Sequence, residues 1–126
     1  MASSSGPPNF PMVDLPSEAV FSVEAVVSFL VGHLIQLGRL PAEHAPQIVS
    51  QILHRETLGA TAIGQGVAIP HCKSQVVHQL QVITGRSLEG FHWLGCVDAQ
   101  PVHIVVLVVA PAADTLHYLE ELARNL

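Results

Sequence analysis

The chain has 126 residues, of which 49% are apolar and 12% are charged, and its formal net charge is −5. This length is typical of one domain with a substantial core, and the hydrophobicity excludes a disordered chain. Lys and Arg together number five and are scattered, which argues against nucleic acid or anionic lipid as a main partner.

The cellular compartment follows from cysteine usage and from the first residues. Cys72 and Cys96 are too few for a disulfide-stapled secreted scaffold. Met1–Pro11 is rich in Ser, Gly and Pro without a basic residue, so we expect a flexible leader rather than a secretory signal, with one domain over residues 12–126. The most apolar window, Val20–Leu37, is interrupted by polar residues and is too short for a membrane span. We therefore expect a soluble, cytoplasmic protein with no stable membrane insertion.

The first elements predicted along the chain are an edge strand and a helix. Short stretches of apolar residues around Val13–Leu15 and Ala19–Phe21 could form an edge strand, although Pro16 interrupts them. A helix is predicted from Val23, with Ser22 as its N-cap and Gly38 as its stop. Its apolar positions fall on one face: Val23, Val26, Val27, Leu30, Leu34 and Leu37.

A second helix is predicted over about residues 43–55, and the composition changes after it. Pro46 lies in its first turn, where a missing N–H is harmless, and Gly59 ends it. The following segment, Thr61–Gly66, is rich in turn residues and leads into a short apolar run, Val67–Pro70.

The remaining elements are strands followed by a helix. Leu80–Thr84 alternates enough for a strand, and Val102–Ala110 is almost continuously apolar, which suits a central strand buried on both faces. Asp114 can cap a last helix. The order of elements predicts an α/β fold: a single-domain sandwich with a mixed central β-sheet flanked by helices.

His71 is the residue best placed for chemistry. It follows Pro70, at the predicted end of a short strand. A neutral imidazole is a good nucleophile near pH 7 and suits a reversible phosphoryl carrier, and the planar guanidinium of Arg55 matches phosphate. Taken alone, the pattern leaves another reading open, because a single histidine after a strand is more often structural, and an arginine near a helix end is favoured by the helix dipole.

A family resemblance favours the chemical reading. The segment Arg55–His71, ending in Gly64-Gln65-Gly66-Val67-Ala68-Ile69-Pro70-His71, resembles the active-site region of the type-2 enzyme IIA domains of the phosphoenolpyruvate-dependent phosphotransferase system, the fructose/mannitol/nitrogen-regulatory class. The similarity extends more weakly to Asp98–Val102 and Val106–Pro111 and covers roughly residues 22–126. Its glycine spacing most resembles the nitrogen-regulatory branch.

The resemblance implies roles for several residues and partners. His71 would be phosphorylated on the ring nitrogen distal to the backbone, and Arg55 would contact the phosphoryl group or its supporting loop. The donor would be the histidine-containing phosphocarrier protein. In sugar-transporting members the acceptor would be a cysteine of an enzyme IIB, which we expect to be a separate protein or absent. In a regulatory relative, the phosphorylated domain would instead control kinases or transporters. No cofactor is implied.

The chain departs from the family pattern in two places. Family members usually carry a second histidine near the first; a gapless alignment puts Thr115 there, and a small gap would bring His117 into place. If Thr115 is the counterpart, we expect slower transfer or a regulatory protein. The family also usually continues for about one more helix beyond Leu126, so we expect an apolar patch that a homodimer would cover.

Two other chemistries are weaker hypotheses. A zinc site of His71, Cys72, His78 and His117 lacks the tight paired spacings of structural zinc sites, so we expect no metal. A nucleophilic Cys72 acting with His71 is disfavoured because adjacent strand residues point to opposite faces. Trp93 is expected to pack in the core.

Overall fold

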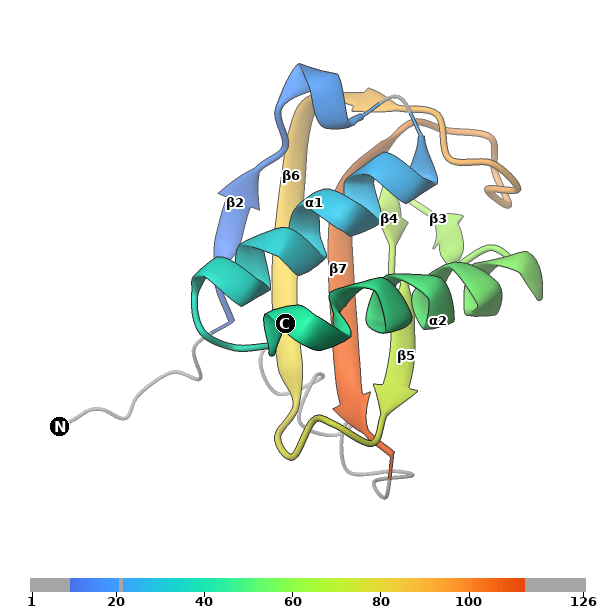
Figure 1. Ribbon diagram of the computed structural model, residues 1–126. Coiled ribbons are helices and arrows are strands. Elements are labelled where there is room, and N and C mark those ends of the chain that lie inside the picture. Colours follow the sequence, from blue (N-terminus) through green and yellow to red (C-terminus); the bar gives the residue numbers. More distant parts are fainter. Residues whose placement is uncertain (1–9, 21, 113–126) are drawn as a thin grey trace, which may run out of the picture.

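A computed structural model of the chain describes residues 10–20 and 22–112. Its centre is a mixed sheet of six strands with two α-helices packed against it (Figure 1). In chain order the elements are β2 (Met12–Asp14), the 3-10 helix η1 (Ser17–Ala19), α1 (Val23–Gln36), the 3-10 helix η2 (Ala42–His44), α2 (Ala45–Thr57), β3 (Ala62–Gly64), β4 (Val67–Ala68), β5 (His71–Ser74), β6 (Gln81–Phe91) and β7 (Val102–Pro111). The predicted α/β class with a mixed central sheet is confirmed.

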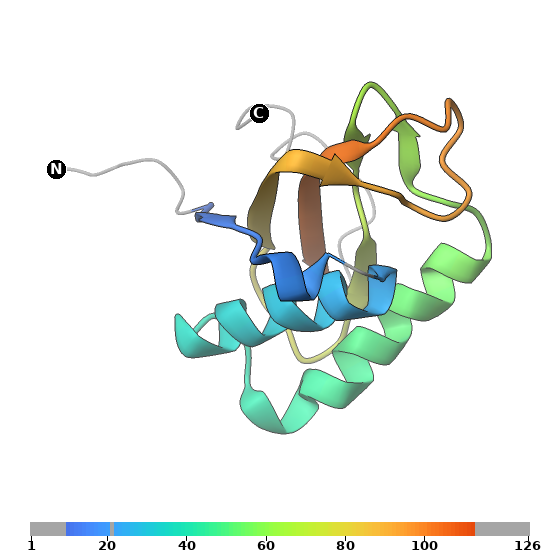
Figure 2. The same ribbon diagram turned by 90° about the horizontal axis from the view of Figure 1, so that it is seen from above.

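The sheet is built around β7. Its strand order is β2-β6-β7-β4-β3, and β5 also pairs with β7. β7 runs antiparallel to β6 and parallel to both β4 and β5, and β2 is parallel to β6 at the edge, as predicted. Seen from above, α1 and α2 lie on the same face of the sheet (Figure 2). The helix predicted from Asp114 lies outside the described residues.

The burial of β7 confirms the prediction of a central strand covered on both faces. Val105, Leu107 and Val109 belong to the large core cluster beneath the helices. Val106 and Val108 alternate with them and form a second buried cluster with Val82 of β6 on the opposite face. A strand covered on both faces needs apolar side chains on both, which explains the continuous apolar run Ile104–Ala110.

Local capping determines the ends of α1. The Ser22 side chain accepts a hydrogen bond from the Ala25 N–H at 3.0 Å, which satisfies one of the free N–H groups of the first turn. At the other end Gly38 adopts φ +74°, and the Arg39 N–H donates to the Leu34 carbonyl at 2.9 Å. This is a Schellman ending, in which glycine takes the left-handed position at little cost. The predicted cap and stop are confirmed.

α2 begins and ends two residues later than predicted. The chain first makes the 3-10 turn η2, and Pro46 then lies in the first turn of α2, as expected. Glu56 and Thr57 continue the helix beyond Arg55, and Gly59 follows its C-cap, Leu58. Ile48 and Ile52 form the fully buried stripe.

β6 is longer than the strand predicted over Leu80–Thr84. It continues to Phe91 because β7 pairs with it along its length, with an irregularity between Arg86 and Phe91. Glycines and charged residues in this stretch conceal the strand from a local pattern, and tertiary pairing overrides their propensity. Within the described residues, no helix has the length and apolar character needed to cross a membrane.

Candidate functional site

His71 is the first residue of β5, not the last residue of a strand as predicted. β4 stops at Ala68 and β5 starts at His71, yet the pairs Ala68↔Val105 and His71↔Val108 keep one register along β7. The break lies at Pro70, which has no N–H to donate to the ladder. His71 therefore lies where a strand beside the central β7 is interrupted and resumes.

The imidazole of His71 is oriented by a backbone carbonyl. Its Nδ1 lies 2.8 Å from the Ile69 oxygen, and the ring is partly buried. A carbonyl oxygen only accepts hydrogen bonds, so Nδ1 carries the proton and Nε2 keeps its lone pair. Among the described residues nothing hydrogen-bonds to Nε2, which leaves this distal nitrogen available as a nucleophile.

A pocket of about 610 Å³ between α2 and β5 includes His71. Its lining residues come from the last turns of the helix and the start of the strand: Ser50, Gln51, His54, Arg55, Leu58, His71, Cys72 and Lys73. The structure thus brings together Arg55 and His71, which the sequence placed sixteen residues apart. Within residues 10–20 and 22–112, none of the residues that line the pocket is acidic, so this lining suits an anion.

Arg55 holds the loop that follows α2. Its Nη1 donates to the Gly59 carbonyl at 2.9 Å, which closes the chain around the helix end. The other guanidinium N–H groups have no hydrogen-bond acceptor within the part of the chain that the structure describes. They can serve as donors to a phosphoryl group without breaking the bond to Gly59.

Glu56 organises the same loop, and the sequence analysis gave it no role. Its Oε2 accepts the Thr61 N–H at 2.9 Å and the Trp93 indole N–H at 2.8 Å, and its Oε1 accepts the Thr61 hydroxyl at 2.9 Å. Trp93 is fully buried, as predicted. A buried indole N–H needs a hydrogen-bond acceptor, so a tryptophan expected in the core indicates that some polar residue must accept its N–H. That residue is Glu56.

The glycines of the motif build a tight turn between β3 and β4. Gly64, Gln65 and Gly66 all have positive φ, of 107°, 60° and 80°. Asp98 holds this turn: its Oδ2 accepts the Gln65 N–H and its Oδ1 accepts the Gln100 N–H, both at 3.0 Å. These N–H donors, first that of Gln100 and then that of Gln65, lower the pKa of the Asp98 carboxyl.

Comparison with known proteins identifies the family. The family model described as "Phosphoenolpyruvate-dependent sugar phosphotransferase system, EIIA 2" matches residues 13–126. The chain belongs to this EIIA family.

Curated relatives of this EIIA chain include sugar-transport and regulatory proteins. The fructose-specific EIIABC component of Bacillus subtilis is 35% identical over 101 residues, which span 80% of this chain but only 15% of that protein. The fructose-specific EIIA component of Haloferax volcanii is 31% identical over 82% of this chain and 67% of its own length. The nitrogen regulatory protein of Bradyrhizobium diazoefficiens is 34% identical over 69% of this chain and 56% of its own length.

Solved structures share the fold of this EIIA chain. Nitrogen regulatory protein IIA-Ntr from Neisseria meningitidis superposes with a TM-score of 0.74 at 27% identity, covering 90% of this chain and 73% of that one. The complex of IIA-mannitol with phosphorylated IIB-mannitol from Escherichia coli gives 0.64 at 21% identity, covering 89% and 81%. The second likeness concerns the fold alone.

Cys72 lines the pocket of His71 but is not a reactive thiol, and His78 is not among the residues that line the pocket. Cys72 is buried in the core, and burial raises the pKa of its thiol to about 11, so it stays protonated near neutral pH. His78 is exposed in the turn after β5. Over residues 10–20 and 22–112, no three His, Cys, Asp or Glu side chains are grouped so that they could hold a metal ion. Thr115 and His117 lie outside the described residues.

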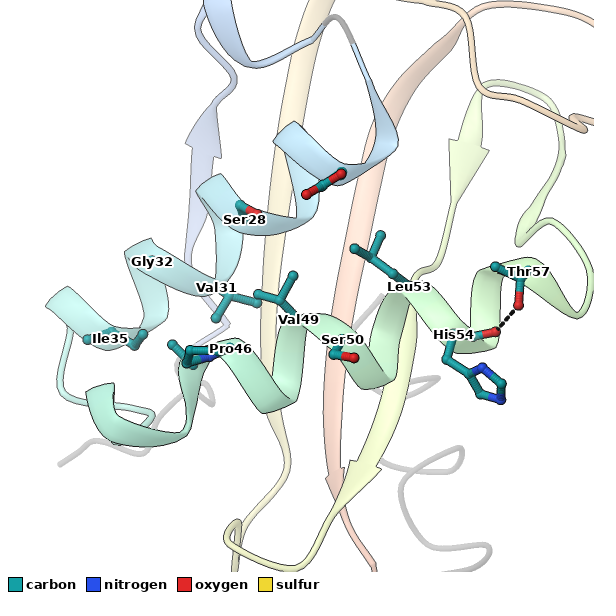
Figure 3. Close-up of a pocket in the computed structure, with 12 residues that line it drawn as sticks. Ser28, Val31, Gly32, Ile35, Pro46, Val49, Ser50, Leu53, His54 and Thr57 are labelled. Atoms are coloured by element: carbon teal, nitrogen blue, oxygen red, sulfur yellow. Dashed lines mark hydrogen bonds between the residues drawn. The ribbon is translucent and has the colours of Figure 1, made fainter.

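A larger hollow of about 710 Å³ lies between α1 and α2 and is no candidate site. Figure 3 shows Val31, Val49 and Leu53 directed into the space between the two helices. Neither Arg55 nor His71 lines it, and most of its surface is apolar. We therefore take the smaller pocket at β5 as the candidate site, because its lining includes a nucleophile and cations, and volume alone does not indicate function.

Proposed function

We propose that this EIIA chain is a phosphoryl carrier that accepts a phosphoryl group on His71 from the histidine-containing phosphocarrier protein. One observation carries the proposal. The bond between Nδ1 of His71 and the Ile69 carbonyl leaves Nε2 unprotonated, in a pocket that also holds the Arg55 guanidinium. A phosphoryl acceptor needs such a lone pair and a cation close to it.

The proposed transfer step needs no proton movement. The P–N bond of the donor's phosphohistidine, whose other ring nitrogen is protonated, breaks as the Nε2–P bond of His71 forms. The group passes as PO₃⁻, and the donor ring leaves as a neutral imidazole. The Nδ1 proton of His71 stays in place and donates to the Ile69 oxygen as the ring becomes cationic. The protein's contribution is then in-line positioning and compensation of the charge on the phosphoryl oxygens.

Arg55 contributes to both tasks in this proposal. Its bond to the Gly59 carbonyl fixes the direction of the guanidinium, which otherwise lies on a flexible side chain. Its remaining N–H groups would donate to phosphoryl oxygens, in the bidentate manner that arginine favours.

We propose an enzyme IIB as the acceptor when the chain serves sugar transport. The IIA-mannitol protein of Escherichia coli, which shares this fold, has been solved with phosphorylated IIB-mannitol. Transfer from His71 to a IIB cysteine would again move PO₃⁻, from nitrogen to a thiolate sulfur, and restore the neutral imidazole.

A regulatory role is the second candidate function. The fold is closer to Neisseria IIA-Ntr than to the mannitol protein, and a nitrogen regulatory protein is among the curated relatives. In this role the negative charge added at His71 would change which proteins bind, without onward transfer. We expect a pull-down with His71→Asp to capture partners different from those of the wild type; identical partner sets would exclude control by phosphorylation.

The carrier function is tested by intact-protein mass spectrometry. Phosphoenolpyruvate, enzyme I and the histidine-containing phosphocarrier protein are expected together to add one acid-labile phosphoryl group to the wild type. His71→Ala should add none, whereas the matched control His78→Ala, a change at an exposed histidine, should behave as the wild type. Absence of added mass on the wild-type chain would refute the proposal.

The second-histidine position stays a prediction with its own test. If His117 takes that position, His117→Ala should slow phosphorylation of His71, and Thr115→Ala should not. If Thr115 takes it, Thr115→His should speed transfer. Sedimentation equilibrium tests the predicted homodimer separately.

A further inference from the structure

Lys73 shares the face of β5 that carries His71. Exposure alternates along this strand: His71 and Lys73 are the more exposed positions, and Cys72 and Ser74 are buried. Because successive side chains point to opposite faces, Lys73 lies on the same side as His71, roughly 7 Å along the strand. A flexible four-carbon stem can carry its ammonium group across that spacing.

The charge around the pocket is unlike that of the rest of the chain. The sequence has ten acidic residues and only five Lys and Arg. Two of those five cations, Arg55 and Lys73, line the pocket of His71, and no acidic residue among those the structure describes does so. Two cations close to one nucleophile produce a positive local electrostatic potential in a protein of negative net charge, and such a potential suits an anion.

The two cations differ in how they are held. Arg55 is bound to the Gly59 carbonyl by one of its N–H groups. Lys73 is exposed, and within residues 10–20 and 22–112 its ammonium group makes no hydrogen bond or ion pair. A structural lysine would be expected to pair with a carboxylate or a carbonyl. An unpaired ammonium group on the strand face and in the pocket of His71 is available to an anionic ligand.

We propose that Lys73 is a second phosphoryl-binding residue, whose ammonium group contacts a non-bridging oxygen of the phosphoryl group on His71. The inference rests on the phosphoryl-carrier function proposed above. No bond forms at Lys73 and it loses no proton; its charge stabilises the transferring group together with Arg55. Sequence reasoning had assigned this charge to Arg55 alone.

A small-molecule donor tests this contact without any partner protein. Phosphoramidate phosphorylates imidazole directly: its P–N bond breaks, ammonia leaves, and the Nε2–P bond of His71 forms. Lys73→Gln is expected to slow this reaction about tenfold, less than the loss of a buried donor, because Lys73 is exposed. Lys73→Arg should stay within about twofold of the wild type, since it keeps the charge.

The control variant is Arg86→Gln, which removes a cation on β6, on the other side of β7 from β5, where Arg86 pairs with Asp14 of the edge strand β2. It should react as the wild type does. Equal rates for Lys73→Gln and the wild type would overturn the inference. So would a Lys73→Arg variant as slow as Lys73→Gln, or failure of phosphoramidate to load His71.

A second readout uses the fact that Lys73 is the only lysine of the sequence. Acetylation by an N-hydroxysuccinimide ester at this position is read by peptide mapping with no other ε-amine present. Phosphorylation of His71 should protect Lys73 severalfold, and equal acetylation would count against the contact. Phosphoenolpyruvate with its two donor proteins could fail to phosphorylate His71 while phosphoramidate phosphorylates it and thereby protects Lys73 from acetylation. In that case the carrier function is wrong and the Lys73 site stands.

Discussion

Replacing Glu56 by alanine is expected to lower the free energy of unfolding by about 3 kcal/mol, although the residue is only partly buried. The change removes the acceptor of three hydrogen bonds and leaves the N–H of the fully buried Trp93 without a partner. An orphaned buried donor alone costs about 1–3 kcal/mol, and the two bonds to Thr61 account for the remainder.

Glu56→Gln is the matched control for this prediction. Its amide oxygen can take the place of Oε2 and accept the N–H groups of both Thr61 and Trp93, while its NH₂ group donates to the Thr61 hydroxyl. Only the charge assistance of the bonds is lost, so we expect a cost of about 1 kcal/mol.

Urea unfolding followed by far-UV circular dichroism measures both variants. The chain has a single tryptophan, so the Trp93→Phe background must be followed by dichroism as well. A double-mutant cycle between Glu56→Ala and Trp93→Phe should give a coupling energy of about 1–2 kcal/mol. Equal costs for the Ala and Gln variants at Glu56, or zero coupling, would refute the role assigned to this carboxylate.

Three further predictions test the turn, the core and the rim of the pocket. Gly64→Ala should lower the free energy of unfolding in urea by about 2 kcal/mol, because φ is +107° and a Cβ would lie 3.1 Å from a carboxylate oxygen of Asp98. Gly59 has open space around it, so Gly59→Ala should change this free energy by less than about 0.5 kcal/mol. Burial raises the pKa of Cys72 from 9.0 to about 11, so between these pH values the folded state keeps a proton that the unfolded chain releases. The free energy of unfolding of the wild type, measured relative to that of Cys72→Ala, should therefore fall by about 2 kcal/mol as the pH rises from 9 to 11. Parallel pH profiles of the two proteins would contradict this. Leu58 is 72% exposed at the pocket rim, so Leu58→Asp should raise the phosphocarrier concentration for half-maximal phosphorylation about fivefold without loss of stability, while Leu88→Asp, at an 85% exposed position outside the pocket, should not.

The elements predicted correctly are those whose signal is local. Ser22 and Gly38 bound α1 because capping depends on the residues at the helix ends, and the run Val102–Ala110 is apolar because both of its faces are covered. The second half of β6 has no such signal. Its pairing with β7 depends on residues far along the chain, so no local pattern over Gly85–Phe91 could predict it.

The sequence predicts that Arg55 and His71 form the candidate site, but it does not predict the residues that support them. Family resemblance and the chemistry of imidazole and guanidinium both select His71 and Arg55, and the fold places them in one pocket. The Glu56–Trp93 bond joins residues 37 positions apart. Sequence reasoning can state that a buried indole needs an acceptor, but the choice among the carboxylates depends on the tertiary fold.

Pro70 connects the sequence motif to the chemistry most directly. Because it lacks an N–H, the strand beside β7 cannot pair continuously and splits into β4 and β5, although its own carbonyl still accepts the Val108 N–H at 3.0 Å. The preceding carbonyl, that of Ile69, accepts a hydrogen bond from Nδ1 of His71. The Ile69 carbonyl thus favours the tautomer of the neutral imidazole with the proton on Nδ1, and in the proposed function this tautomer leaves Nε2 to act as the nucleophile. A proline directly before the histidine thereby connects the interruption of the strand to the orientation of the imidazole.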